Sequence, residues 1–273
     1  MSGERRHPHA RDRMIGAQLR FIRLNRTTLL LDAAAKAAQL SEATLSRVEN
    51  GKRHITVEDA ATLLTIYGVP AADRTELVNA VRDCGRTAGQ WLRPLPGVLP
   101  DTSAASQEVG VRDLTSWAPT TVPALLHTPA YAIASMAAAG IPAAEAERRW
   151  SARARRQEQA HTADHTLYIH EFALRTPFGG PAALKEQILR LTDSGVRVRL
   201  VRAGTVLSTL SHGWTLMRFP QDPAIVHIEL QDSSVYLHAP ETSPYERQAT
   251  HLHQAACSTA ETQHRLSRFV ASL

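Results

Sequence analysis

Several features that define other protein classes are missing from this sequence. It holds two cysteines, Cys84 and Cys257, which lie too far apart for a metal-binding motif. We therefore expect no disulfide framework, and reduced thiols in a cytoplasmic protein. No run of about 18 apolar residues predicts a membrane span. The opening residues, MSGERRHPHARDR, are polar and lack the apolar core of a signal peptide.

Sequence signatures of catalysis are also missing. We find no nucleophile elbow, phosphate-binding loop or paired carboxylates, so we expect no enzyme activity. His161, His165 and His170 are spaced four and five residues apart, which raises the question of a zinc site. No acidic residue stands at the spacing of a metalloenzyme motif. We therefore expect no metal and no other cofactor, and the role of these histidines stays open.

The excess of positive over negative charge lies at the start of the chain. Residues 1–53 carry eleven Lys and Arg against five Asp and Glu, a net charge of +6, whereas the whole chain carries +5. A concentration of like charge of this kind is typical of a segment that meets a polyanion. The N-terminal fifth of the chain is therefore the part expected to contact nucleic acid.

The first part of the chain reads as a series of short helices. Apolar residues recur at helical spacing, Thr56 is a cap before a first turn of acids, and Gly51 and Gly68 are suited to helix ends. The expected helices are 14–26, 31–38, 41–50, 56–68 and 73–84. We predict an all-α, five-helix helix-turn-helix domain over residues 13–84, preceded by a flexible basic tail over residues 1–12.

A Gly-, Pro- and Ser-rich stretch, residues 85–110, then reads as a linker, although Trp91 within it suggests local packing. Beyond it, residues 111–273 mix helical patterns with short alternating strands. The expected strands are 166–174, 196–203, 214–220, 224–230 and 233–240. We predict an α+β domain with a mostly antiparallel sheet. Its final helical stretch, residues 244–273, has an apolar series that needs a partner surface, either the sheet or a second copy of the chain.

Residues 41–50 have the surface of a recognition helix that reads bases in the major groove. Leu45 and Val48 point inward, which leaves Glu42, Ala43 and Arg47 facing outward. Arg can contact guanine with two hydrogen bonds, Glu can accept from cytosine, and Ala can lie against a thymine methyl. We expect these three residues to contact bases.

A second group of residues flanks this helix and is expected to contact phosphates, which set register rather than sequence preference. For Asn50 we expect the backbone N–H to make the contact. The group consists of Ser41, Thr44, Ser46, Asn50, Lys52 and Arg53.

Residues 13–70 resemble the lambda-repressor-like helix-turn-helix family of the Cro/repressor, xenobiotic-response-element type. The specific match is SEATLSRVENGK, which fits the family pattern S-x-x-x-[IL]-S-x-x-E-x-G. The resemblance implies that Glu49 is an interior carboxylate paired with Arg23. The chain departs from the family at Gln39, where Gly is usual, and at Leu30 and Leu31, where a polar cap and a phosphate-contacting Gln are usual.

The stretch WAPTTVPALLHTPAYA, from Trp117 onward, resembles the C-terminal domain of actinobacterial antitoxin-like transcriptional regulators. RARRQ, IHEFAL, FGG and LKEQILRL match the same domain in order, while Ala124 and His127 replace the usual Gly and Gln. Within the IHEFAL match, Glu171 is either paired with an arginine or part of a pocket, and we expect it to pair with Arg197 or Arg199 of a neighbouring strand.

Together these features predict a transcriptional regulator that binds double-stranded DNA in the cytoplasm. A single recognition helix reads few base pairs, so we expect a homodimer. The C-terminal domain is expected to dimerise and to bind either a small partner protein or a small-molecule ligand. The alternative is an antitoxin-like interaction protein whose main role is to hold a small partner protein.

Overall fold

The structure is a computed structural model of the whole chain. It describes residues 10–82, 89–92, 104–105, 108, 110–160, 164–205, 212–220, 222–230 and 233–273. Residues 1–9 of the predicted basic tail, most of the predicted linker, Cys84 and His161 lie outside the described residues. Residues 10–12, predicted as the end of the flexible tail, instead form the start of the first helix. None of the described helices is long and apolar enough to cross a membrane.

The N-terminal region is helical and contains the predicted helix-turn-helix pair. Its helices are α1 (Ala10–Arg26), α2 (Leu31–Ala37), α3 (Glu42–Glu49), α4 (Val57–Ile66) and α5 (Ala71–Arg82). The hydroxyls of Ser41 and Thr56 accept hydrogen bonds from backbone N–H groups in the first turns of α3 and α4, which satisfies donors that a helix start leaves open. Ile15, Leu19 and Leu45 are fully buried in one shared core with α4 and α5.

The turn between α2 and α3 depends on an unusual backbone conformation at Gln39. Its φ is 57°, and it is the one described non-glycine residue with positive φ. The turn closes with a hydrogen bond from the N–H of Leu40 to the carbonyl of Ala35. A non-glycine residue in this left-handed region costs about 1–2 kcal/mol. The conformation of Gln39 therefore lowers the free energy of unfolding.

The C-terminal region contains a mixed sheet. Its strands are β2 (Asp113–Ala118), β3 (Asp164–His170), β4 (Arg197–Val201), β5 (Trp214–Arg218), β6 (Ile225–Glu229) and β7 (Ser234–Leu237). A further strand, β1 (Gly89–Leu92), comes from the predicted linker, and the order is β1-β7-β6-β5-β2-β3-β4. The predicted α+β class is confirmed, but the sheet is not simply antiparallel, because β2, β3 and β4 run parallel to one another.

Three strands of this sheet differ from the sequence prediction. Strand β2, which lies inside the sheet between β5 and β3, was not predicted, since the segment DLTSWA mixes polar and apolar residues without a long alternation. The strand predicted over residues 166–174 ends at His170, and Glu171–Leu174 form a 3₁₀ turn, η2. Strand β1 places Trp91 opposite Val235 of β7, so part of the predicted linker belongs to the sheet.

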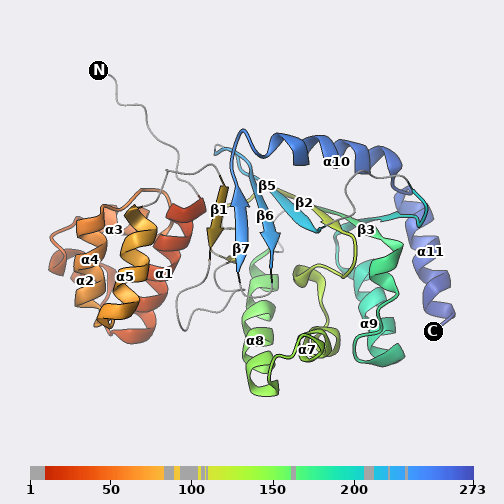
Figure 1. Cartoon of the computed structure of the whole chain (residues 1–273), viewed down its shortest axis with the longest axis horizontal. Helices are drawn as coiled ribbons and strands as arrows, with labels where there is room; N and C mark the ends of the chain where they lie inside the picture. Colours follow the sequence, from red (N-terminus) through yellow and green to blue (C-terminus); the bar gives the residue numbers. More distant parts are fainter. Residues whose placement is uncertain are drawn as a thin grey trace.

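Helices cover both faces of the sheet (Figure 1). They are α7 (Pro129–Ala138), α8 (Ala143–Ala160), α9 (Gly180–Asp193), α10 (Ser243–Ala255) and α11 (Thr259–Ala271), with a 3₁₀ turn η1 (Ala124–Leu126) before α7. The stretch predicted as one terminal helical segment is α10 and α11. Leu252 of α10 packs on one face of the sheet with Trp117 and Trp214, while Leu266 of α11 packs with α9 and β4. The sheet therefore supplies the partner surface for this apolar series.

The positive φ of Gln39 leads to a stability prediction in which two glycine substitutions have opposite effects. Replacing Gln39 with Gly should raise the free energy of unfolding by about 1 kcal/mol, because glycine adopts positive φ at little cost. Ala33→Gly, at an exposed position inside α2, should lower it by about 1 kcal/mol through lost helix propensity. Urea unfolding of both variants measures the difference, and equal effects of the two substitutions would refute the strained turn.

Candidate nucleic-acid interface

Helix α3 presents a continuous exposed surface at its N-terminal end. Ser41 caps the helix, and Glu42, Ala43 and Arg47 are exposed. Leu45 and Val48 are buried on the opposite side, as helical spacing requires. The three residues expected to contact bases therefore lie together on one accessible face of the helix.

The polar groups around this face are held by local hydrogen bonds. The Nε of Arg47 donates to the carbonyl of Ala43 at 3.1 Å, so the guanidinium lies along its own helix. Ser41 Oγ accepts from the N–H of Thr44 and donates to the Thr44 hydroxyl at 2.9 Å. Arg53 Nη1 donates to the same hydroxyl at 3.4 Å. Lys52 and Arg53 are exposed just beyond the end of the helix.

The hydrogen bonds of Asn50 differ from what we predicted from the sequence. Its backbone N–H, which we expected to contact phosphate, donates to the carbonyl of Ser46 at 3.0 Å, and its side-chain amide donates to the same carbonyl at 2.7 Å. Asn50 is the C-cap of α3, and a helix end uses such donors to close its last turn. The backbone N–H of Asn50 is therefore already used within the helix.

Close contact with α1 fixes the position of α3. A Cβ added to Gly16 would lie 1.9 Å from the carbonyl oxygen of Val48, so glycine permits the two helices to cross at this distance. Gly51 has a φ of 65°, and a Cβ there would lie 2.6 Å from the Cα of Arg13. These two glycines let the start of α1 pack directly against the end of α3.

A buried ion pair joins the same two helices. Arg23 donates from Nε and Nη2 to the two carboxylate oxygens of Glu49, at 2.8 and 2.7 Å, and the side chains are 8% and 3% exposed. Arg23 also donates to the carbonyl of Leu29 at 3.1 Å. The hydrogen bonds with Glu49 raise the pKa of Arg23. Burial, and then the Glu49 carboxylate, raise the pKa of nearby Tyr67.

The departures from the family pattern lie at the start of α2. Leu30 occupies the N-cap without a side-chain hydrogen bond and is 72% exposed. Leu31 is half-buried against the helical core. Neither side chain can donate to a phosphate, so any contact with the DNA backbone at this helix must come from main-chain groups or neighbouring side chains.

A contact between the helical region and the sheet was not predicted. The Nη2 of Arg13 in α1 lies 2.7 Å from Oδ2 of Asp222, in the connection between β5 and β6. Its guanidinium carbon also lies 4.1 Å from the ring centre of Phe219, within the range of a cation–π interaction. Burial lowers the pKa of Arg13, while Asp222 acts in the opposite direction. Nothing in the local sequence could reveal this pair, because 209 positions separate the two residues.

The remaining candidates from the sequence do not form a second site. His165 is buried with its Nε2 2.9 Å from Ser116 Oγ, and His170 Nδ1 accepts from the N–H of Phe172. No group of three or more His, Cys, Asp or Glu in the described part of the chain is placed to hold a metal ion.

Glu171 does not pair with Arg197 or Arg199 as expected. Its Oε2 accepts from the N–H of Ala203, and its Oε1 lies 3.8 Å from Arg265 of α11. The expectation was wrong because the strand ends one residue before Glu171.

The ion pair between α1 and α3 gives a stability prediction. Glu49→Ala should lower the free energy of unfolding by about 3–5 kcal/mol, because it leaves the Arg23 guanidinium buried without its carboxylate. Glu58→Ala, at an exposed position in α4, is the matched control and should change it by less than about 0.5 kcal/mol. Thermal or urea unfolding measures both, and a stability of Glu49→Ala equal to that of the control would remove the structural role.

Comparison with known proteins follows the same division of the chain. Residues 15–77 match a helix-turn-helix domain family, and residues 102–268 match the domain of unknown function DUF5753. No curated protein matches the chain. The crystal structure of the clp gene regulator ClgR from C. glutamicum is 26% identical, over 29% of this chain and 97% of that chain, with a TM-score of 0.23. That TM-score is too low for the likeness to support an argument. The DUF5753 match spans more than half of the sequence, so the chain belongs to the DUF5753 family and carries a helix-turn-helix domain ahead of it.

Proposed function

We propose that this protein is a sequence-specific transcriptional regulator that places α3 in the major groove of double-stranded DNA. The observation that carries the proposal is the exposed N-terminal face of α3, capped by Ser41 and held against α1 by buried contacts. The net charge of +6 over residues 1–53 favours a polyanionic partner at this end of the chain. The pattern Ser41–Gly51 supports the lambda-repressor-like, xenobiotic-response-element type.

In this proposal Glu42, Ala43 and Arg47 contact base edges. Arg47 exchanges its hydrogen bond to the Ala43 carbonyl for contacts with guanine, a stronger charge-assisted pairing in the groove. Ser41, Thr44, Ser46, Lys52 and Arg53 lie around the same surface and contact phosphates. Asn50 contributes through its side chain, because the amide keeps a second N–H beside the one that it donates to Ser46, whereas its single backbone N–H is used by the helix.

The proposal assigns dimerisation and regulation to the C-terminal region, in a protein that works in the cytoplasm. Two recognition helices are needed for a high-affinity operator, and a homodimer supplies them. Arg13 supports coupling between the regions, because it contacts Asp222 and Phe219 on one side and Gly51 on the other. A conformational change near the β5–β6 connection would therefore act on the end of α3 through Arg13.

Arg47 and Lys52 should affect DNA binding differently. Arg47→Ala should cost about 1–3 kcal/mol of operator affinity and relax the preference at one base position. Lys52→Ala should weaken binding to all sequences alike and reduce the slope of log affinity against log salt by about one unit. Fluorescence anisotropy with the chain's own upstream DNA, measured over a range of salt concentrations, separates the two effects.

Lys185→Ala is the matched control, since it removes an exposed positive charge from α9. It should leave both operator preference and the salt slope unchanged. Unchanged affinity and preference in Arg47→Ala would show that α3 does not read bases. A chain that binds no DNA but co-purifies with a small partner protein would instead favour the antitoxin-like function.

Truncation tests whether dimerisation and regulation belong to the C-terminal region. A fragment of residues 1–93 should be monomeric, should bind operator DNA weakly, and should lose any response to a ligand or partner, because it lacks the region proposed to dimerise. Analytical ultracentrifugation and anisotropy measure these properties. A fragment that stays dimeric with full operator affinity would place dimerisation in the helical region.

A further inference from the structure

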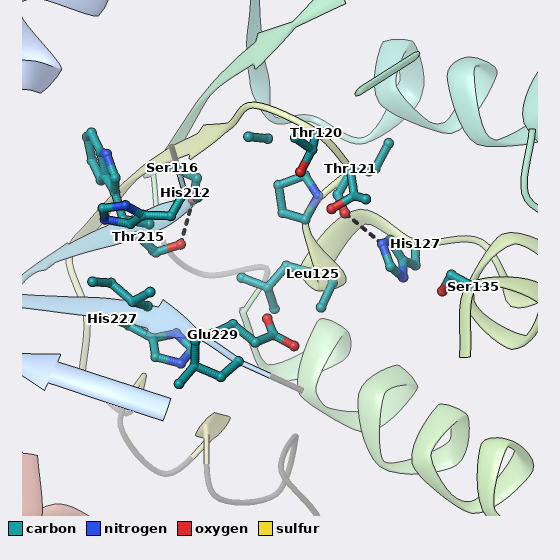
Figure 2. A pocket seen from close by; sticks show the side chains of 18 of the residues that line it. Ser116, Thr120, Thr121, Leu125, His127, Ser135, His212, Thr215, His227 and Glu229 are labelled. Atoms are coloured by element: carbon teal, nitrogen blue, oxygen red, sulfur yellow. Dashed lines mark hydrogen bonds between the residues drawn. The ribbon is translucent and has the colours of Figure 1, made fainter. Parts of the chain in front are cut away.

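The cavity shown in Figure 2 has a volume of about 400 Å³ and lies on the face of the sheet that carries α7 and α8. Arginines of α8 line it, and their side chains have partners inside the protein. Arg156 donates to the carboxylate of Glu108 at 2.6 Å. Arg153 donates to Nδ1 of His127 at 2.9 Å, and Glu229 lies 3.9 Å from the same guanidinium. The positive charge at this cavity therefore stabilises the contacts of α8 with its neighbours.

A different cavity, of about 330 Å³, lies between η2, the end of β4 and α11. Its deep part is apolar, because Leu174, Leu200 and Leu266 line it and are at most 3% exposed. Phe269, which is half-buried, also lines it. Figure 1 shows α11 at the end of the sheet away from the helical N-terminal region, and β4 is the edge strand opposite β1. This cavity is therefore remote from the recognition surface proposed for α3.

The charged residues that line this second cavity are mostly cationic. Arg175, Arg265 and Arg268 line it, and Glu171 is the acid among its described lining residues. Three positive charges and one negative charge leave a net charge of +2. By contrast, residues 54–273 carry 20 Lys and Arg against 21 Asp and Glu, a net charge of −1. The cavity is thus a local concentration of positive charge in a nearly balanced part of the chain.

Two of these arginines have no ion-pair partner in the part of the chain that the structure describes. Arg175 directly follows η2, and Arg268 lies in the last turn of α11. Both side chains are exposed, so their guanidinium groups are at the open side of the cavity. A cation in the last turn of a helix is favourable in itself, but this does not account for Arg175, which belongs to another element.

Glu171 joins the two sides of the cavity. Its Oε2 accepts from the N–H of Ala203 at 2.8 Å, and its Oε1 lies 3.8 Å from Arg265, beyond hydrogen-bonding distance. Arg265 also donates to Glu261 at 3.0 Å. From the sequence, Glu171 had two possible roles, in an ion pair with an arginine or in a pocket. In the structure it has both, and it offsets only one of the three positive charges.

A phosphate monoester matches this arrangement better than a carboxylate does. It carries a charge of about −1.5 to −2 at pH 7 and three strong acceptor oxygens. A guanidinium group presents its donors as a rigid fork that pairs with two such oxygens. A carboxylate has one charge and two oxygens, so it cannot use guanidinium groups from both η2 and α11 to the same extent.

We propose that this cavity binds a small organic phosphate monoester, whose phosphoryl group pairs with Arg175, Arg265 and Arg268 and whose organic part lies against Phe269. A volume of about 330 Å³ is near the lower end of the range for small-molecule sites. The role of this ligand as a regulatory signal rests on the proposed function, whereas its binding does not.

Isothermal titration calorimetry on the full chain, in a buffer without phosphate or sulfate, tests the site with phenyl phosphate as the probe. We expect one molecule to bind per chain. Phenol, which lacks the charge, and benzoate, which has one charge, should bind at least about tenfold more weakly. Inorganic phosphate should bind at least about threefold more weakly, because it lacks the ring that contacts Phe269. Equal binding of any of these three compounds, or no binding of phenyl phosphate, would overturn the proposal.

Variants assign this binding to the cavity, since the basic N-terminal region also attracts phosphate. Arg175→Gln and Arg268→Gln should each weaken the binding of phenyl phosphate by about tenfold, because each removes a charge that pairs with the phosphoryl group. Glu171→Gln should strengthen it by about two- to fivefold, because the amide oxygen still accepts from Ala203 while the competing charge is lost. Arg247→Gln is the matched control, since Arg247 is exposed on α10 and does not line the cavity. It should have no effect.

The opposite signs of Arg268→Gln and Glu171→Gln protect the test against misfolding, which would weaken binding in both. Unchanged binding in Arg175→Gln and Arg268→Gln, weaker binding in Glu171→Gln, or an equal loss in Arg247→Gln would overturn the proposal. Operator affinity is measured separately with and without phenyl phosphate. Binding of phenyl phosphate without any DNA binding would leave the cavity proposal intact and remove the proposed function, so the two failures are distinguishable.

Discussion

The buried pair between Arg23 and Glu49 is the interaction on which the proposed recognition surface depends. It joins α1 to the end of α3 with two charge-assisted hydrogen bonds in an environment from which water is excluded. Such a pair adds little net stability over apolar residues, but it tolerates only one relative position of its partners. Gly16 and Gly51 allow the close approach that the pair requires. The exposed face of α3 is therefore oriented by contacts on its hidden side.

The helical region could be predicted closely from the sequence because its signals are local. Ser41 and Thr56 are caps whose partners lie three residues away, and the positions of Leu45 and Val48 follow from the helical period. Even so, Asn50 shows a limit of this reasoning. Its backbone N–H was expected to contact phosphate, but the end of the helix already uses that group.

The sheet was harder to predict because its contacts are distant in sequence. Strand β2 lies inside the sheet, yet its segment lacks a long alternation, and the hydrogen bonds of its buried Ser116 side chain are made with His165 of β3 and Thr215 of β5. Arg268 in the sequence is one charged residue among several on an amphipathic helix. It lines a cavity with Glu171 only because α11 packs beside η2. A candidate site formed by residues that are distant in sequence can be identified only from the three-dimensional structure.

Strand β1 has a consequence for how the protein avoids self-association. It pairs antiparallel with β7 and forms one edge of the sheet, and helix α1 contacts it. Without β1, the backbone N–H and C=O groups along the outer side of β7 would be an open template for strands of other molecules. The DUF5753 match begins at residue 102, after β1, so the region that it defines lacks the strand that completes its own sheet. In the intact chain, the segment leading out of the DNA-binding region thus also shields the sheet from aggregation.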